Sequence, residues 1–211
     1  MSIIRNISDS LQYPIKNWAK LIILGVILVI PVVNFIGLGY YLRIMKSTWA
    51  GLDELPDFRG VGELFIDGLK VLIVCIIYAI VPLIFYALSF VFAGSAIFLA
   101  AALIFAIMIS MFAYMGVANM AYYDSEIGAA LQYREIFARI AAIGWGNYII
   151  WWIVLTLIMI VAGLIIGVVG GILLFFILGF LVLLLGYSYL TIFQARSIAL
   201  TFTVNRGTLR C

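Results

Sequence analysis

Uncharged, strongly apolar stretches alternate along the chain with short clusters that hold its charged residues. Three stretches contain no Asp, Glu, Lys or Arg: residues 21–42, 71–123 and 140–195, which are 22, 53 and 56 residues long. A helix crosses the hydrocarbon core of a bilayer with about 20 apolar residues. The second and third stretches are therefore each long enough for two spans, and we interpret each as a transmembrane helical hairpin.

Each of the two long stretches has a turn signal near its middle. Ala93-Gly94-Ser95 interrupts the apolar residues of the second stretch, and the segment from Gly167 to Gly171 does the same in the third. Glycine is typical of turns because it tolerates the backbone angles of a chain reversal, and serine because its hydroxyl can hydrogen-bond to nearby backbone. We therefore expect short, uncharged tips at both places.

The first stretch, residues 21–42, admits two interpretations. Its 22 residues, at about 1.5 Å each, are long enough for a single span, but a bend at Pro31 and Asn34 would make it a re-entrant segment. Basic residues favour the cytoplasmic side of a membrane. Re-entry places all 12 Lys and Arg residues on one side, whereas five spans with an external N-terminus place nine inside and three outside. We favour re-entry with both termini cytoplasmic, and the five-span arrangement is the alternative.

Two of the charged clusters contain amphipathic segments that we interpret as helices lying in the membrane interface. The first covers about residues 58–70, with Asp57 as its expected N-cap, and the second covers about residues 128–143. Such helices either recognise lipid or only align the hairpins. A shorter apolar stripe near the N-terminus hints at a third one. The apolar positions at helical spacing are Phe58, Val61, Leu64, Phe65 and Leu69; Tyr133, Ile136, Phe137, Ile140 and Ile143; and Ile3, Ile4, Ile7 and Leu11.

Composition agrees with a membrane protein. Of the 211 residues, 67% are apolar and 10% are charged, and the mean hydropathy is +1.29. A soluble domain has about 25% charged residues and at most about half apolar ones, so these values exclude a soluble enzyme, a disordered chain and a nucleic-acid-binding module. We expect one all-α transmembrane domain over residues 1–211: a polytopic integral membrane bundle of helical hairpins with amphipathic interfacial helices.

The chain offers few groups for catalysis or metal binding. It has no histidine, which removes Ser-His-Asp and Cys-His catalysis and histidine metal ligands. Its three uncharged stretches hold no carboxylate or amine that could relay protons at membrane depth. The two cysteines, Cys75 and Cys211, are far apart in sequence and do not have metal-ligand spacing. We therefore expect no enzymatic activity, no metal and no cofactor.

A set of motifs occupies residues 39–82: Gly39-Tyr40 with Arg43, Leu55-Pro56-Asp57-Phe58, Asp67-Gly68-Leu69-Lys70, and Tyr78 with Pro82. This set resembles the prokaryotic family of small polytopic membrane proteins known as domain of unknown function 4013. The resemblance is specific over these 44 residues and extends over the rest of the chain only in hydropathy. It implies a polytopic membrane fold of this size and supplies no catalytic residue, substrate or cofactor.

These patterns favour a protein that binds membrane lipids or a membrane partner, such as a second copy of the chain, without catalysing a reaction. Arg43, Asp67 and Lys70 are the candidate headgroup-binding residues, because they lie where a charged cluster meets the membrane. The alternative is a small oligomeric channel or transporter whose path is lined by the break between Pro31 and Asn34, since irregular backbone at membrane depth must be buried or face water. We expect a multi-pass protein of the cell membrane with cytoplasmic charged loops and a cytoplasmic C-terminus.

Overall fold

The computed structural model describes residues 2–92, 94–174 and 177–203. These residues are predominantly helical and contain no β-strand, and four of their helices are long and apolar enough to cross a membrane. The expected all-α fold of a polytopic membrane protein is thus confirmed. In chain order, the elements are α1 (Ile3–Gln12), the 3-10 turn η1 (Pro14–Lys16), α2 (Trp18–Val29), α3 (Asn34–Trp49), α4 (Val61–Val91), α5 (Ala96–Tyr122), α6 (Ile127–Ala130), α7 (Tyr133–Ile143), α8 (Trp145–Leu173) and α9 (Ile177–Phe202).

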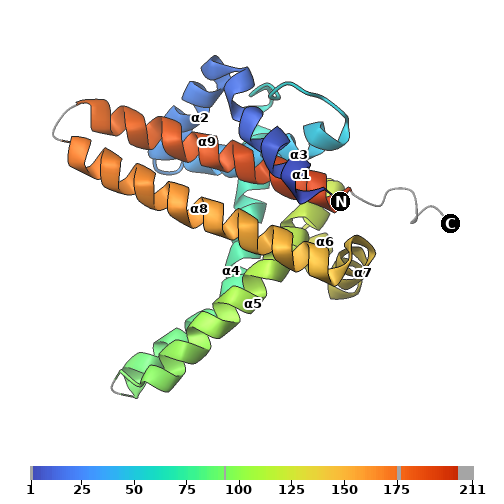
Figure 1. The fold of residues 1–211 in the computed structure, drawn as a ribbon, viewed down its shortest axis with the longest axis vertical. Coiled ribbons are helices and arrows are strands. Elements are labelled where there is room, and N and C mark those ends of the chain that lie inside the picture. Colours follow the sequence, from blue (N-terminus) through green and yellow to red (C-terminus); the bar gives the residue numbers. More distant parts are fainter. Residues whose placement is uncertain (1, 93, 175–176, 204–211) are drawn as a thin grey trace.

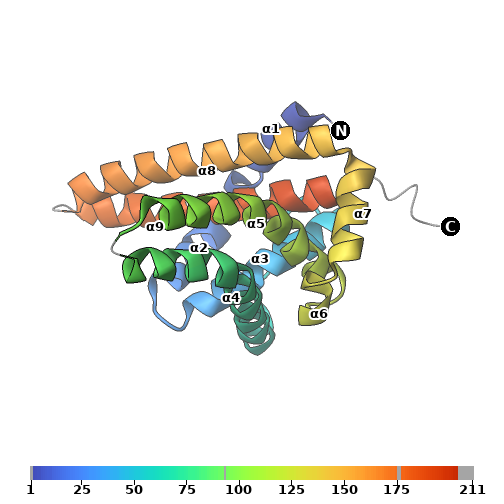
Figure 2. The same ribbon diagram turned by 90° about the horizontal axis from the view of Figure 1, so that it is seen from below.

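Two long hairpins form the frame of the molecule. α4 packs against α5 and α8 packs against α9, and the two pairs diverge from a common base (Figure 1). Seen from below, both hairpins extend to the same side, away from α6 and α7 (Figure 2). Divergence leaves most of their apolar surface uncovered: in the most apolar window of α5, only 6% is buried. Such surfaces are suited to contact with lipid rather than water.

The tip of the α4–α5 hairpin lies where the sequence predicts it. α4 ends at Val91 and α5 begins at Ala96, and between them Gly94 adopts a left-handed backbone conformation with φ of 78°. Glycine is the residue that reaches this region at least cost.

The predicted turn between Gly167 and Gly171 is wrong, because α8 continues through this segment to Leu173. Within this segment, Gly170 serves helix packing instead of chain reversal, together with Gly179 of α9. A Cβ atom on Gly170 would lie 2.5 Å from Cδ2 of Leu183, and one on Gly179 would lie 2.2 Å from the carbonyl carbon of Leu173. Small residues allow α8 and α9 to approach closely just before their connection.

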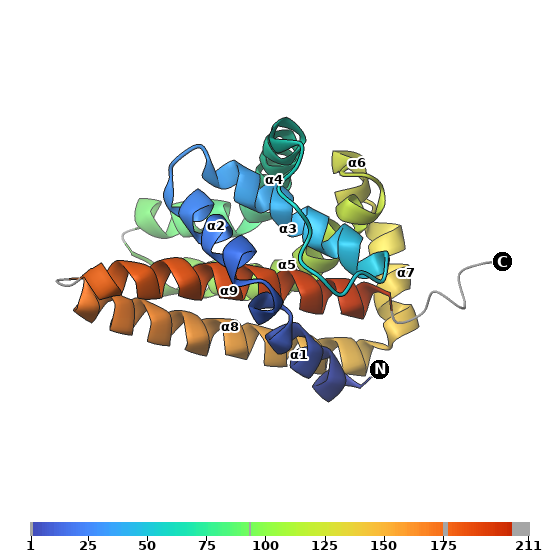
Figure 3. The same cartoon turned by 90° about the horizontal axis from the view of Figure 1, so that it is seen from above.

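Residues 21–42 do not form one continuous helix. α2 ends at Val29, the chain turns at residues 30–33, and α3 runs back beside α2, as Figure 3 shows from above. Val32 takes a positive φ of 71° within this turn, next to Pro31. Close packing joins the two helices, since a Cβ on Gly37 would lie 2.6 Å from Cδ2 of Leu28. The chain reversal fits the re-entrant interpretation, and placement in the bilayer stays a prediction.

α3 and α4 cross in backbone contact. A Cβ atom on Gly39 of α3 would lie 1.9 Å from the carbonyl oxygen of Leu64, and one on Gly68 of α4 would lie 1.8 Å from the carbonyl oxygen of Phe35. No side chain larger than a hydrogen atom fits at either position without separating the helices. The two glycines of the sequence motifs therefore allow direct backbone contact between α3 and α4.

The two predicted interfacial segments have different outcomes. Residues 58–70 do not form a separate helix: α4 begins at Val61 after Gly60, whose φ is 68°, and continues without a break to Val91. Asp57 is therefore not an N-cap. No glycine turn or proline separates residues 61–70 of α4 from the apolar residues that follow directly, so the helix continues across this boundary.

The second segment divides into short α6 and a separate amphipathic helix, α7, which ends at Ile143, just before Gly144 with its φ of 92°. Ile136, Ile140 and Ile143 on α7 are buried, whereas Phe137 remains 44% exposed. One part of the predicted apolar stripe thus packs on the protein, and the other part faces outward.

Candidate functional site at the charged end

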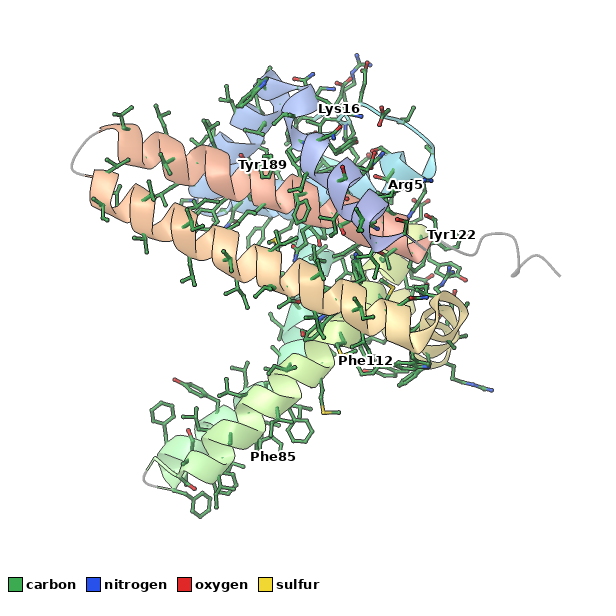
Figure 4. All side chains as sticks on the ribbon, viewed as in Figure 1. Arg5, Lys16, Phe85, Phe112, Tyr122 and Tyr189 are labelled. Atoms are coloured by element: carbon green, nitrogen blue, oxygen red, sulfur yellow. The ribbon has the colours of Figure 1, made fainter. Side chains whose placement is uncertain are left out.

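Polar and charged side chains gather at the base of the molecule, where α1, α3, α7 and α9 converge. Figure 4 shows Arg5, Lys16 and Tyr122 in this region, whereas Phe85 lies within the projecting α4–α5 hairpin. The base also holds large buried side chains that anchor it, including Trp151, whose Nε1 donates a hydrogen bond to Ser197 Oγ at 3.0 Å. We refer to this region as the charged end.

An irregular loop between α3 and α4, residues 50–60, crosses the charged end (Figure 3), and we call it the strap. Its backbone carbonyls accept hydrogen bonds from side chains of four different parts of the fold. Because the strap is not part of a helix or sheet, these donors satisfy carbonyls that would otherwise need water. The bonds run from Arg196 to Leu52, Tyr13 to Glu54, Lys20 to Leu55, Tyr40 to Pro56, and Arg43 to Asp57 and Arg59.

Arg196 of α9 is the central cation of the charged end, and only 7% of it is exposed. Its Nε lies 2.9 Å from Asp9 Oδ2 on α1, and its Nη2 lies 3.4 Å from Asp53 Oδ1 on the strap. The guanidinium also donates to Thr48 Oγ1 and stacks 4.4 Å from the ring centre of Tyr13. A buried guanidinium needs such a complete set of partners. Arg196 therefore ties together α1, α3, α9 and the strap.

Two lysines pair with acidic residues of the strap. Lys16 Nζ lies 2.6 Å from Asp53 Oδ1, and Lys20 Nζ lies 2.8 Å from Asp57 Oδ1. Hydrogen bonds from these lysines hold the pKa of both carboxyl groups below the usual aspartate value. Since both carboxylates are largely exposed, the pairs orient the strap more than they stabilise it.

The structure does not bring the three candidate headgroup-binding residues together in one contact set. Arg43 anchors the strap through its carbonyls and lies 3.8 Å from a carboxylate oxygen of Glu63. Asp67 and Lys70 form their own pair on α4 at 3.6 Å, one helical turn apart. Both cations remain accessible, with 25% of the Arg43 side chain and 33% of the Lys70 side chain exposed.

A second polar cluster lies between α5 and α7, around Glu135. Its carboxylate accepts hydrogen bonds from Arg139 Nη2 at 2.6 Å and from the Tyr123 hydroxyl at 2.9 Å. Donation to this carboxylate raises the pKa of Tyr123. The fully buried Asn119 also donates to Glu135, at 3.4 Å, while its own Oδ1 has no partner among the described residues. The cluster fixes α7 against the end of α5.

The break at residues 30–33 also carries an unusual polar group. Oδ1 of Asn34, at the start of α3, is buried and accepts no hydrogen bond from the described residues. An unpartnered amide oxygen costs free energy in an apolar environment. This unpartnered oxygen is the observation that favours the alternative interpretation, a solute path near Pro31.

Sequence reasoning did not identify Arg196, Tyr13 or Asn6, although they organise the charged end. Arg196 follows the last uncharged stretch and has the same sequence context as an ordinary membrane-flanking arginine. The sequence cannot distinguish a buried guanidinium from an interfacial one here, because the partner Asp9 stands 187 positions earlier in the chain and comes close only in the folded structure. A polar residue on the buried face of a predicted amphipathic helix, such as Asn6, was the available signal.

Four membrane-length apolar helices joined to a polar, ion-paired end define the protein as a polytopic α-helical membrane protein. Its family can also be given. Residues 23–171 match the family of proteins of unknown function designated DUF4013, and the chain belongs to this family. The resemblance found in residues 39–82 is thereby confirmed. Those motifs make up one physical unit, in which α3 and α4 cross and hold the strap.

A curated relative shares part of this sequence. The uncharacterized protein MJ1189 of Methanocaldococcus jannaschii is 31% identical over 148 residues, which cover 64% of this chain and 50% of the relative. The chain thus spans about half the length of that protein. No solved structure matches the chain. These relationships establish family membership and assign no activity.

Proposed function

We propose that this protein is a non-enzymatic integral membrane protein that binds anionic lipids, or a membrane partner, at its charged end. The single observation that carries the proposal is the separation of surfaces: apolar hairpins extend to one side, and cationic side chains converge at their base (Figures 2 and 4). Such a base lies at headgroup level when the hairpins are in the hydrocarbon core.

Arg43 and Lys70 are the cations proposed to meet phosphate groups. Their acidic partners are held loosely, because the Arg43–Glu63 distance is 3.8 Å and the Lys70–Asp67 distance is 3.6 Å. Even well-formed ion pairs near the protein surface typically contribute about 1 kcal/mol or less, and these partly accessible pairs are long. A lipid phosphate with several acceptor oxygens can therefore replace the carboxylate at either cation without a large cost.

Lipid binding to purified protein tests this proposal. In neutral detergent, fluorescent phosphatidylglycerol should bind several-fold more weakly to a variant carrying Arg43→Gln and Lys70→Gln than to the wild type. Phosphatidylcholine should distinguish the two proteins far less. Arg59→Gln is the matched control, since 91% of that side chain is exposed and its pair with Asp57 is long, at 3.5 Å. Equal phosphatidylglycerol binding by all three proteins would refute the assignment of these residues.

A small oligomeric channel or transporter is the second candidate, favoured by the buried, unpartnered Oδ1 of Asn34 beside the Pro31 break. A polar solute or water passing the turn would satisfy this oxygen. Proteoliposomes should then show selective solute flux that Asn34→Leu abolishes. A leak that is unselective and unaffected by the substitution would exclude the path.

We further propose that the protein resides in the cell membrane with its charged end toward the cytoplasm. A single cysteine placed at Lys46 or Arg134, in a chain lacking its native cysteines, should react with a membrane-impermeant maleimide only after the cells are opened. Labelling from outside intact cells would reverse this orientation. Cross-linking in the same cells tests whether the uncovered hairpin faces contact a second copy or another membrane protein.

A further inference from the structure

α1 has three chemically different sides, and this division is not apparent from its apolar stripe alone. In an α-helix, consecutive residues point about 100° apart. Ile4 is 83% exposed, Arg5 is exposed, and Asn6 is only 4% exposed. These three neighbours therefore present an uncovered apolar side, an uncovered polar side and a side docked on the protein, respectively.

The same order repeats two turns further along. Leu11 is 38% exposed, Gln12 is exposed, and Tyr13 is fully buried. Seven residues complete almost two turns of an α-helix. Leu11 thus lies in line with Ile4, Gln12 with Arg5, and Tyr13 with Asn6, so each side of α1 keeps one chemical character over its whole length.

The protein-facing side of α1 is held by polar contacts. Asn6 Nδ2 donates to the Ser197 carbonyl at 3.1 Å and to Thr201 Oγ1 at 3.0 Å, and Ser197 Oγ donates back to Asn6 Oδ1 at 2.7 Å. Asp9 adds the ion pair with Arg196. An amphipathic helix docked on a protein in water buries its apolar side and exposes its polar residues. α1 instead buries the polar Asn6 and Ser10 and leaves Ile4 and Leu11 uncovered, while Ile3 and Ile7 pack partly against the core.

The uncovered aliphatic side continues beyond α1. Ile15 of η1 is 46% exposed and Trp18 at the start of α2 is 58% exposed, and the apolar surface then follows α2. Tryptophan is enriched at the level of the headgroups, where its ring meets both lipid and water. The exposed side chains of α2 are Ile22, Ile23, Val26 and Val29.

We propose that α1 lies along the boundary of the bilayer, with Ile4 and Leu11 in contact with acyl chains, Arg5 and Gln12 in contact with water and headgroup phosphates, and its third side docked on α9. The occupant of the uncovered side is lipid, because α1 leads directly into the uncovered apolar residues of η1 and α2, in a chain whose long helices are apolar enough to cross a membrane. Arg5 forms no ion pair with the described residues and is free to meet a phosphate. The boundary plane therefore runs along the axis of α1.

Spin-label accessibility tests the proposal in nanodiscs of phosphatidylcholine alone, so that the result does not depend on anionic lipid binding. In a Cys75→Ser, Cys211→Ser background, labels are introduced singly by Leu11→Cys and by Gln12→Cys. Collision with oxygen, which is concentrated in lipid, is compared with collision with a water-soluble nickel chelate. The oxygen-to-nickel ratio should be several-fold higher at Leu11 than at its neighbour Gln12.

Ile4→Cys and Arg5→Cys provide an independent pair with the same expectation. All four side chains are directed away from the docked side, so labels there leave the contacts of Asn6 intact. Equal, high nickel accessibility at all four positions would mean that α1 lies in water. Low accessibility of all four to both reagents would mean that a protein partner covers them. Either result overturns the proposal.

Discussion

The crossing of α3 and α4 gives a prediction whose size follows from the structure. Gly39→Ala adds a Cβ atom that would lie 1.9 Å from the carbonyl oxygen of Leu64, whereas real Cβ contacts are essentially never shorter than 3.0 Å. The two backbones must therefore separate by roughly 1 Å, because a backbone oxygen does not move aside as a side chain does. Overpacking of this kind costs about 1–3 kcal/mol, and more when backbone is involved.

Thermal unfolding in detergent, followed by tryptophan fluorescence, measures this loss. For a chain of this size, each kcal/mol lowers the midpoint by roughly 2–4 °C. Gly62→Ala is the matched control on α4, since a Cβ at Gly62 meets nothing within 4 Å. This control should unfold at the wild-type temperature or slightly above it, because alanine favours helix over glycine by about 0.5–1 kcal/mol. Equal midpoints for Gly39→Ala and Gly62→Ala would refute the close crossing.

A double variant refines the test. Gly68→Ala would place a Cβ 1.8 Å from the carbonyl oxygen of Phe35 at the same crossing. One separation of the helices relieves both clashes, so Gly39→Ala and Gly68→Ala together should cost less than the two single losses added. Strict additivity would indicate two unconnected sites.

Three further predictions concern the charged end. Arg196→Gln should raise hydrogen exchange in both α1 and the strap, because it leaves charged hydrogen-bond partners unmatched. The loss in free energy of unfolding should be about 1–3 kcal/mol. Arg59→Gln, on an exposed side chain, should change exchange little. The pKa of Asp53 is lowered in the folded protein, so its contribution to stability is complete above the unfolded value of about 3.9 and is lost as the pH falls through the lower folded value. The protection of strap amides, measured as their exchange rate relative to the intrinsic rate at each pH, should therefore stay constant from pH 7 down to about pH 4. A loss of this protection near pH 6 would contradict the assignment. Tyr78→Phe removes a buried 2.6 Å hydrogen bond to a carbonyl of α6 and should lower the free energy of unfolding by about 1 kcal/mol, with greater exchange confined to α6.

The sequence was sufficient for the features that hydrophobicity alone determines. Uncharged stretches of 53 and 56 residues are each long enough for two membrane-spanning helices and too long for one, and both form helical hairpins in the structure. Gly94 indicated the tip of the α4–α5 hairpin, because glycine is one of the few residues in an apolar stretch that signals a turn. The role of Gly170 was misjudged, since a glycine that allows close packing has the same sequence appearance as one that turns the chain.

Tertiary contacts decided the rest. Phe58 was assigned to an interfacial helix, yet it stacks on Tyr40 with ring centres 4.1 Å apart and belongs to the strap. Arg43, Asp67 and Lys70 were grouped because they are close in the sequence of one charged cluster. In the structure, Arg43 donates hydrogen bonds to the strap, whereas Asp67 and Lys70 pair with each other on α4. Sequence distance along one cluster could not show that the partners of Arg43 would be backbone carbonyls.

The manner in which the strap is attached has a consequence for how this segment can vary. Besides the ion pairs of Asp53 and Asp57, hydrogen bonds attach the strap through its main-chain oxygens. Any residue at position 52 or 54 therefore offers the same acceptor to Arg196 or Tyr13. Exchange of such a side chain should be harmless, whereas insertion or deletion of a single residue would shift every acceptor out of register with its donor. Spacing between α3 and α4, more than chemical identity along the way, is what this connection must preserve.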